Sequence, residues 1–555
     1  LRNAITREEG RNKYFLLPFL FGIIGLWYLI NKNPQWALVN ILLFGMTGVL
    51  LIVYSNQPPI EPRERDYVLV GSFVIFCIWI GMGVLGIYEF LKEKKVPGTI
   101  AALGVTILGL IAVPTVMANQ GWDDHNRSGR FMARDFAKDF LESCPKNAIL
   151  FTQGDNDTYP LWYAQEVEGI RPDVRVTNLS LLGVDWYIQR LQKAANTSGP
   201  LPFVKDFTVD KYRGDKRDFT QFMENQAVVN PNEYLDIQKV ISFILSDKPE
   251  FMATNQNGDM VNYLPTTKFK LKVNKADAIK YCGLPDSLNN RIVDEIVWDL
   301  GKTSIIKFDL AVLALVAGND WSRPICFANT VEPGYYNGLD KFLIQKGMCY
   351  QFVPVAFPQN QRGYTVMDLD SCYNNIMNKF EYGGLDKQKM FVDENSNRLL
   401  VNVKSLHLRL ADELSRNGQK EKSVKVLERM REKFTNENVP YYGISPVYYN
   451  YYSVSWIDLY FRNEKPDLAA KIYNPYIDDL SDAMRFFSLN NSFSREYGEE
   501  MKSGQEDVQR LTQMAVQYKD QKLLDLLKKK FPGMIPAEAN INGQTPTGLE
   551  GQGLQ

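Results

Sequence analysis

The chain reads AILFTQGDNDTYPLWYAQEVEGIRPDVRVTN over residues 148–178, and this stretch decides the fold. It predicts an apolar strand over 148–152, a polar turn over 154–157, a helix over 158–168 and a second strand over 174–178. A strand, a helix and a strand in this order form a right-handed βαβ unit with parallel strands. The sequence therefore predicts an α/β sheet at the centre of the chain.

Asp155, Asn156 and Asp157 lie in the predicted turn after the first strand. Open α/β sheets bind ligands at the carboxyl ends of their strands, which is where this turn lies. A divalent cation or sugar hydroxyls are the candidate ligands, since carboxylate and amide oxygens bind both. An Asx turn followed by a cap on the helix at Thr158 explains the same residues without a ligand. The two interpretations are equally supported.

Apolar residues make up 45% of the whole chain, but residues 1–118 are much more apolar than the rest. Four apolar runs cover residues 14–30, 34–54, 67–91 and 97–118. At about 1.5 Å per residue, each run is roughly 25 to 37 Å long, against a hydrocarbon core of about 30 Å. We therefore predict four transmembrane helices, in preference to four helices buried in a soluble core.

The loops between these runs carry unequal numbers of basic residues. The first and third loops share four lysines, and the second loop holds two arginines: Lys32, Lys92, Lys94 and Lys95 against Arg63 and Arg65. Because the more basic loops stay in the cytoplasm, the region after the fourth run is predicted to lie outside. Basic residues ahead of the first run favour the opposite orientation.

The second loop reads NQPPIEPRERDY over residues 56–67. Its prolines stiffen the backbone, and Arg63, Glu64, Arg65 and Asp66 crowd together at the predicted membrane surface. A guanidinium binds two phosphate oxygens at once, so the loop is a candidate site for a phosphate or a lipid headgroup. A solvated cluster whose charges pair with one another is the equally supported alternative.

Asp123, Asp124 and His125 follow the fourth run directly. Aspartate and histidine bind metal ions, but helix capping and local ion pairs are the favoured interpretation of these three residues. The chain has 2 histidines, His125 and His407, which excludes a zinc site built on several histidines. No cofactor is identified, and the net charge of -1 gives no overall field that would attract nucleic acid.

Short strands and helices alternate over residues 119–385, which predicts an external α/β domain. In this domain, residues 194–262 have a weak pattern and are predicted to be loop. Arg323 lies in WSRPICFA over residues 321–328. We interpret this motif as the start of a strand with a packed tryptophan, in preference to a ligand-binding role for the arginine. The sequence pattern over residues 292–308 does not distinguish strands from a helix.

Residues 386–535 lack strand patterns and are predicted to be helical, either as tetratricopeptide-type hairpins or as a plain bundle. The last helical stretch is predicted to run from Asp507 to Phe531. Residues 536–555 are rich in glycine, asparagine, glutamine and threonine, which predicts a disordered tail.

Five cysteines follow the apolar runs without the spacing of a metal or redox motif: Cys144, Cys282, Cys326, Cys349 and Cys372. An odd number of thiols outside the membrane leaves at least one of them free, and a Cys326–Cys349 bridge is one candidate pairing. The sequence begins at Leu1 with no methionine and no signal-peptide pattern, so we expect a C-terminal part of a longer protein.

Four motifs carry a resemblance to a known family: PRERDY (62–67), WDDHNRSGR (122–130), GDNDTYPLWYAQEVEGIRPDVRV (154–176) and WSRPICFA (321–328). They resemble the C-terminal half of a bacterial multi-pass membrane family of unknown function, which is related to the eukaryotic transmembrane O-mannosyltransferase of the glycosyltransferase C superfamily. The resemblance implies sugar transfer from a lipid-phosphate donor on the outer face of the membrane. The superfamily's acidic catalytic residue lies further upstream, so no catalytic residue is assigned here.

Two functions from different classes follow. The first is the C-terminal part of a membrane glycosyltransferase that uses a lipid-linked sugar to modify a protein acceptor. The second is a non-catalytic envelope scaffold or binding protein anchored in the membrane. Both predict a multi-pass protein of the bacterial inner membrane with its large soluble region in the periplasm, in contact with membrane lipid. The upstream sequence discriminates the two functions.

Overall fold

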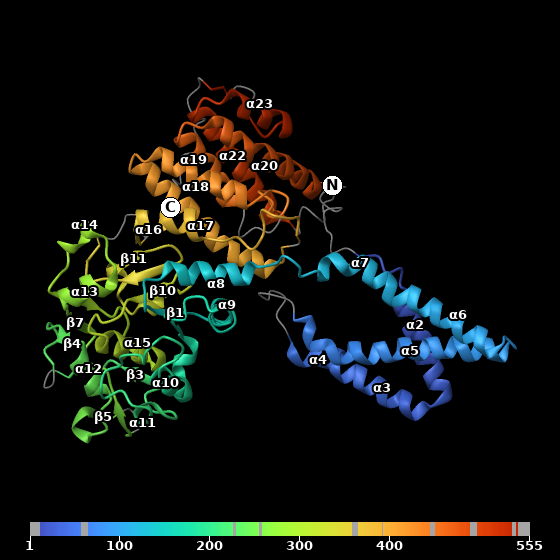
Figure 1. Cartoon of the computed structure of the whole chain (residues 1–555), viewed down its shortest axis with the longest axis horizontal. Helices are drawn as coiled ribbons and strands as arrows, with labels where there is room; N and C mark the ends of the chain where they lie inside the picture. The colour runs from blue at the N-terminus through green and yellow to red at the C-terminus, as the bar shows by residue number, and fades with distance from the viewer. Residues whose placement is uncertain are drawn as a thin grey trace. The chain divides into compact units, whose positions relative to one another are not determined.

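The computed structural model describes nine stretches of the chain: residues 12–56, 65–225, 229–254, 258–357, 365–390, 392–443, 450–488, 497–535 and 540–541. The chain divides into two compact units, Arg2–Ser128 and Gly129–Gln555 (Figure 1). The first unit holds the apolar runs, and the second holds the mixed sequence that follows. The predicted domain boundaries after residues 118, 385 and 535 stay predictions.

The first unit is built from apolar helices: α2 (Leu17–Lys32), α3 (Pro34–Thr47), α4 (Val49–Ser55), α5 (Val70–Glu93), α6 (Gly98–Leu110) and α7 (Val116–His125). Among the described residues, three helical stretches are long and apolar enough to cross a membrane, namely Pro34–Ser55, Asp66–Glu93 and Gly98–Trp122. The third stretch continues from α6 into α7 through a π-helical turn at Ile111–Thr115 that contains Pro114. Three of the predicted spans are therefore confirmed by length and composition.

The first predicted span corresponds to a helix of similar length that is short for a membrane crossing. Tyr14 precedes the helix, and α2 has 16 residues, which makes it about 24 Å long against the roughly 30 Å of a hydrocarbon core. Pro18 lies in the first turn of α2, where proline is favoured, so the helix begins later than the apolar run does. The fourth span therefore stays a prediction.

Helices α2 and α5 approach each other closely through glycines. A Cβ atom added at Gly25 would lie 1.7 Å from the carbonyl oxygen of Trp79. A Cβ atom added at Gly83 would lie 2.2 Å from the carbonyl oxygen of Phe21. Small residues at a helix contact let two backbones meet in this way inside a membrane. Lys32 and Glu89 also form an ion pair of 2.6 Å between the two helices.

The second unit contains a mixed six-stranded sheet in the order β13-β11-β12-β10-β1-β2. Its strands are β1 (Ile149–Thr152), β2 (Arg175–Asn178), β10 (Ile325–Ala328), β11 (Leu343–Gln345), β12 (Cys349–Phe352) and β13 (Val366–Met367). Strand β1 is parallel to β2 on one side and to β10 on the other. The predicted βαβ unit is thus confirmed. Strand β12 runs antiparallel to β10, and the register pairs Ala328 with Cys349.

Two helices beside the parallel strands follow from their apolar patterns. Helix α8 (Met132–Ser143) buries Phe136 and Phe140, whose ring centres lie 4.7 Å apart. Helix α15 (Lys307–Gly318) buries every residue from Leu310 to Ala317. A helix that is apolar on all sides belongs in the interior of a protein, which is where α15 lies.

Residues 194–262 contain short helices and strands between their loops, so the prediction of a loop there was wrong in part. Besides short pieces, the segment forms α12 (Ile237–Ile244), which Asp236 caps by accepting a hydrogen bond of 2.9 Å from the Gln238 backbone. Helix α10 (Asp185–Leu191) precedes this segment, and the other elements within it are α11 (Val209–Tyr212), β3 (Phe219–Gln221), β4 (Leu235–Asp236), β5 (Met252–Thr254) and β6 (Met260–Asn262). These elements are shorter than the windows in which periodicity is visible.

The undecided segment 292–308 contains two strands, β8 (Glu295–Asp299) and β9 (Ser304–Ile306). Strand β8 pairs with β7 (Lys268–Lys272), on which Phe269 and Leu271 are buried, and β9 pairs with β3. Strand β4 pairs with β7 on its other side, and β5 pairs with β6. Helices α13 (Lys275–Cys282), α14 (Asp286–Asn289) and α16 (Leu369–Asn374) complete this part.

The remainder of the second unit is helical, as predicted. Its helices pack as α17 with α18, α19 with α20 and α22 with α23. They cover Glu394–Arg416, Lys420–Lys433, Asn450–Arg462, Pro466–Phe487, Gly498–Gln517 and Gln521–Lys530 in that order. The predicted stretch from Asp507 to Phe531 is broken, because Asp520 caps α23 by accepting a hydrogen bond of 2.8 Å from the Leu523 backbone. The predicted disordered tail lies almost entirely outside the described residues.

Candidate functional site

The carboxyl ends of three parallel strands meet at one edge of the main sheet. They are Thr152 in β1, Asn178 in β2 and Ala328 in β10, brought together by the parallel registers. Side chains that follow these strands converge here although they come from distant parts of the chain. This edge, which we call the carboxyl edge, is the position at which the sequence predicted a ligand site.

Helix α9 (Asp155–Glu166) begins at the carboxyl edge, directly after Gly154. Gly154 has a φ of 78°, which glycine adopts without strain and which turns the chain from strand to helix. The predicted turn over 154–157 and the predicted helix start at Thr158 were therefore wrong by one helical turn. Asp155 and Asp157 lie in the first turn of α9, where acidic side chains are favoured by the helix dipole.

Asp157 is the buried acid of the carboxyl edge, with 2% of its surface exposed. Its Oδ2 accepts hydrogen bonds from the Gln153 backbone at 3.0 Å and from the Thr330 hydroxyl at 2.6 Å. Its Oδ1 is buried and has no hydrogen-bond partner among the described residues. Burial raises the pKa of the Asp157 carboxyl, because the charged form loses solvation.

A network of polar side chains holds the start of α9 against the strand ends. The Asn178 amide donates to the Gly154 carbonyl at 2.9 Å and to the Thr158 hydroxyl at 2.8 Å. The hydroxyls of Thr152 and Thr158 lie 2.7 Å apart, also within hydrogen-bond distance. These buried bonds fix the geometry of the carboxyl edge, since breaking any one leaves a buried polar group unpaired.

The outer side of the carboxyl edge faces solvent. Asp155 and Asn156 are exposed, unlike Asp157. One helical turn further along α9, Tyr159 is 56% exposed, and its ring centre lies 5.5 Å from that of Trp162. Exposed carboxylate and amide groups beside an exposed aromatic ring can bind a polyhydroxylated ligand, the polar groups at its hydroxyls and the ring at its apolar face.

Arg323 lies away from the carboxyl edge, next to the amino end of β1. Its guanidinium donates to the Asn147 carbonyl at 2.9 Å, the Gly199 carbonyl at 3.2 Å and the Ser198 hydroxyl at 2.9 Å. Burial and the nearby Arg175 charge lower the pKa of Arg323 to about 10. These contacts agree with the favoured interpretation, in which this segment is the start of a strand and Arg323 has a structural role. A ligand role for Arg323 stays a prediction.

The remaining candidates belong to the first unit. Arg65 and Asp66 are exposed at the start of the third apolar stretch, whereas Arg63 and Glu64 lie outside the described residues. Asp123, Asp124 and His125 form the end of α7, and the His125 Nδ1 lies 2.7 Å from the Gly121 carbonyl oxygen. Within the second unit, the structure brings together Asp155, Asn156 and Asp157.

The residues around the candidate acids differ from those of a typical cation site. Among the described residues, one group of at least three histidine, cysteine, aspartate or glutamate side chains lies close enough together to share an ion. This group consists of three cysteines and does not include Asp155 or Asp157. A cation at the carboxyl edge would rest mainly on the unpaired Asp157 Oδ1. Divalent cations usually take several oxygen ligands, so sugar hydroxyls are the better supported ligand of this edge.

Sequence reasoning missed three residues of the carboxyl edge: Asn178, Thr330 and Tyr159. Asn178 ends β2 and Thr330 follows β10, so polar residues at the ends of two apolar strands were the available signal. The pairing of β10 with β1 could not be predicted from the sequence, because 173 residues separate Asp157 from Thr330. Tyr159 lies within the quoted motif, but its exposure depends on how α9 packs.

Comparison with known proteins gives two kinds of match. Residues 133–371 match the family model described as TMEM260-associated domain 2. The chain is related to the TMEM260 family. The match covers α8, the strands of the main sheet and the carboxyl edge, and it ends within α16. The related region is therefore the α/β part of the second unit.

Two curated relatives from the TMEM260 family have been matched over short stretches. Protein O-mannosyl-transferase tmem260 of Dictyostelium discoideum is 25% identical over 185 residues, which is 30% of this chain and 23% of that protein. Protein O-mannosyl-transferase TMEM260 of Mus musculus is 33% identical over 58 residues, 10% of this chain and 8% of that protein. The chain thus aligns with less than a quarter of either relative, and no solved structure matches it significantly.

Proposed function

We propose that this chain is part of a membrane glycosyltransferase that modifies proteins. The observation that carries the proposal is the family match over residues 133–371, found in a chain with three helices of membrane-spanning length. Both matched relatives are named protein O-mannosyl-transferases. A related α/β region behind membrane helices supports the same class of activity for this chain.

In this proposal, the carboxyl edge binds either the sugar or the glycosylated segment of the acceptor. The Asp155 and Asn156 side chains are exposed and supply acceptors and donors for hydroxyl groups. The exposed Tyr159 ring supplies a stacking face for a sugar ring. Asp157, Thr158 and Asn178 lie behind them as the rigid support that keeps these side chains in place.

The donor in this proposal is a sugar linked to a lipid phosphate. A phosphate at the membrane surface suits the charged loop that holds Arg63, Glu64, Arg65 and Asp66, because guanidinium groups bind phosphate oxygens in pairs. The prolines of this loop reduce the entropy lost when it presents a fixed surface. The lysine variants Arg63→Lys and Arg65→Lys are expected to weaken donor binding although they keep the charge.

The proposed arrangement in the membrane has four spans, with α2 as a short first span and the second unit in the periplasm of a bacterial inner membrane. The basic loops after α2 and α5 support this orientation. The successive helix pairs α17–α18, α19–α20 and α22–α23 support a tetratricopeptide-like repeat in the tail. The orientation is tested by labelling the cysteine thiol of the Asp210→Cys variant in intact cells, because this position is exposed in the second unit.

The activity is tested with the protein expressed from its own gene in membranes, supplied with a radiolabelled mannosyl lipid phosphate and a protein fraction. We expect label to enter protein, and the double variant Asp155→Ala/Asn156→Ala to transfer about tenfold less, equivalent to about 1.4 kcal/mol. Asp210→Ala removes an exposed acid of α11 outside the carboxyl edge and is the matched control.

Two results would separate the parts of this proposal. If the Asp155→Ala/Asn156→Ala variant transfers as much label as the wild type, the protein is still an enzyme but the carboxyl edge has no role in transfer. No transfer by the wild type, with the protein folded and the donor intact, would overturn the enzyme and favour the membrane-anchored scaffold.

A further inference from the structure

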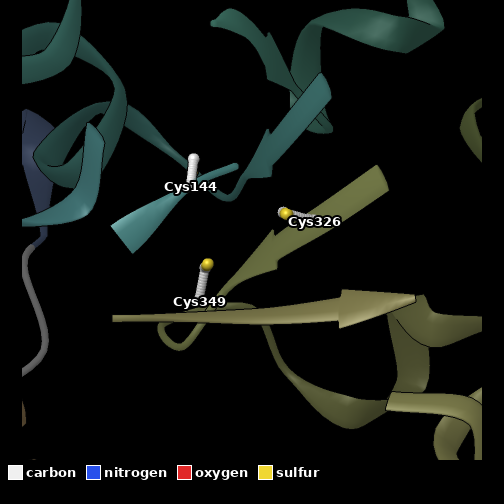
Figure 2. A group of neighbouring side chains, drawn as sticks. All are labelled: Cys144, Cys326 and Cys349. Carbon is white, nitrogen blue, oxygen red and sulfur yellow. The ribbon is translucent and has the colours of Figure 1, made fainter. Parts of the chain in front are cut away.

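Three cysteines from distant parts of the sequence lie together inside the second unit (Figure 2). Cys144 follows α8, Cys326 lies in β10, and Cys349 begins β12. Their sulfur atoms all lie within 4.8 Å of one another, and all three residues are buried. We propose that these residues, which we call the thiol triad, form a binding site for one thiophilic metal ion. The site is separate from the carboxyl edge and from sugar transfer.

The strand register argues against the simplest alternative, a disulfide between Cys326 and Cys349. Cys326 pairs with Gln351, and Cys349 pairs with Ala328, so the two cysteines are diagonal neighbours on antiparallel strands. Diagonal neighbours lie about 7 Å apart, whereas the Cβ atoms of a disulfide lie about 3.5 to 4.5 Å apart. Both thiols are free in this structure. A bond between them would require the sheet to shift.

The spacing suits an ion placed between the sulfurs. When three atoms lie within 4.8 Å of one another, some point lies within about 2.8 Å of each of them. A metal–sulfur bond is about 2.3 Å long. Each sulfur would therefore move inward by no more than about 0.5 Å, which rotation of the cysteine side chains can supply without a change in the sheet.

The type of donor and its burial define the class of ion. Thiolate sulfur selects soft ions, chiefly Cu(I) and zinc, over magnesium or calcium. Cys144 is 5% exposed, and Cys326 and Cys349 have no exposed surface, so the site is closed to bulk water. Among the described residues, no histidine, aspartate, glutamate or further cysteine joins the group. A closed site with three sulfur ligands favours an ion that accepts three ligands, such as Cu(I), and a structural role.

The thiol hydrogens are held weakly, so an ion can replace them. The Cys144 thiol donates to the Phe140 carbonyl at 3.4 Å, and the Cys349 thiol donates to the Ser143 carbonyl at 3.5 Å. Thiols are weak donors, and giving up these bonds costs little. As the ion forms its sulfur bonds, the thiol protons pass to the solvent.

The bound ion would connect three segments that no other covalent or metal link joins among the described residues. These segments are the connection from α8 to β1, strand β10 and strand β12, which lie up to 205 residues apart. An ion that binds the folded chain and not the unfolded chain stabilises the fold in proportion to its affinity. The thiol triad would thus hold the main sheet together from one side.

The proposal is tested on the whole chain, purified in detergent under reducing conditions. Metal content is measured as purified and after titration with Cu(I), and the ultraviolet absorption from sulfur-to-metal charge transfer is recorded. We expect one ion per chain, a rise in melting temperature when the ion is added, and loss of both in Cys144→Ser, Cys326→Ser and Cys349→Ser. Cys282→Ser and Cys372→Ser remove buried thiols outside the thiol triad and are the matched controls.

A measurement on the wild type keeps the proposal open to refutation even if a variant fails to fold. X-ray absorption at the edge of the bound metal should show three sulfur neighbours at about 2.3 Å. The proposal is overturned if the wild type binds no ion, if the bound ion has oxygen or nitrogen neighbours in place of sulfur, or if the three serine variants bind as the wild type does. Two thiols missing from the wild type by mass spectrometry, as in a disulfide, would also overturn it.

Discussion

At the scale of single residues, neighbouring positions in the sequence have opposite environments. Asp155 and Asp157 are both aspartates in the first turn of α9, yet Asp155 is exposed and Asp157 is buried against Thr330. The residue type predicts acid chemistry at both positions, but burial assigns them different roles. Asp157 supports the carboxyl edge, and Asp155 faces the solvent from which a ligand would arrive.

His407 allows a prediction about pH. Its Nε2 lies 2.9 Å from the Tyr382 hydroxyl, its Nδ1 lies 2.7 Å from the Val403 carbonyl, and burial lowers its pKa from 6.5 to about 4. Between these values the unfolded chain binds a proton that the folded chain does not, so stability falls as the pH drops from 6.5 to about 4. Each pH unit in that window costs about 1.4 kcal/mol.

The variant His407→Gln should lose this dependence. Relative to the wild type, it is expected to be less stable near pH 7, with the difference shrinking by roughly 2 to 3 kcal/mol on acidification to about pH 4.5. Chemical unfolding of the purified chain at several pH values measures this, and His125→Gln, in the first unit, serves as the control. Parallel pH curves for wild type and His407→Gln would contradict the prediction.

At the scale of elements, local signals predicted the helices and strands that have strong periodicity, and close contacts decided the rest. The apolar strands β1 and β2 were predicted correctly, because each is a short apolar run with clear ends. The start of α9 was misplaced, because aspartate and asparagine suit both a turn and the first turn of a helix. The two preferences cannot be separated without the packing around Asp157.

The glycine contact between α2 and α5 leads to a prediction about the first unit. Gly83→Val would place a side chain against the Phe21 backbone, so we expect α2 to separate from α5 and stability to fall by about 1 to 3 kcal/mol or more. Gly81→Val is the matched control, because a Cβ atom at Gly81 meets no atom within 4 Å. The melting temperature in detergent and resistance to protease compare the two, and equal behaviour would argue against the contact.

The cap of α23 leads to a second prediction at this scale. Asp520 accepts a hydrogen bond of 2.8 Å from the Leu523 backbone, so Asp520→Ala should cost about 1 kcal/mol of stability. Asp525→Ala removes an exposed acid within the same helix and should change stability much less. Hydrogen exchange of the α23 backbone amides measures both variants. Equal exchange in the two variants would show that the cap contributes nothing.

At the scale of the molecule, the α/β part and the helical tail share one core. A single cluster of buried apolar side chains contains Phe140 and Phe151 from the α/β part and Leu410 and Tyr476 from the tail. Polar contacts cross the same boundary, since the Tyr382 hydroxyl lies 2.9 Å from the His407 Nε2. A boundary near residue 385 is visible in the sequence pattern, but the core continues across it.

The shared core predicts how fragments behave. Residues 129–535 should fold without the membrane helices, because they contain their own core, and should melt in one cooperative transition. Residues 129–385 alone should expose the apolar surface that α17 covers, and should aggregate or melt without cooperativity. Calorimetry and size-exclusion chromatography of the two fragments test this. A soluble, cooperatively folded 129–385 fragment would show that the two parts are independent domains.

The sequence by itself determined what depends on local order along the chain. Apolar runs of sufficient length predict membrane helices, because each span satisfies its own backbone hydrogen bonds within one continuous segment. The βαβ unit is likewise predictable, because its strands and helix are neighbours in the chain and its handedness follows from the twist of the strands. The helical character of the tail follows from the period of its apolar residues.

Only the tertiary structure decided which distant residues meet. Thr330 reaches Asp157, Gly83 meets Phe21, and Cys144 joins Cys326 and Cys349, although nothing in their spacing marks them as partners. Such contacts depend on strand pairing and helix packing, which are set by the whole core and not by a local pattern. For that reason the sequence located the carboxyl edge but not the supporting residues Asn178 and Thr330, and it listed the cysteines without revealing the thiol triad.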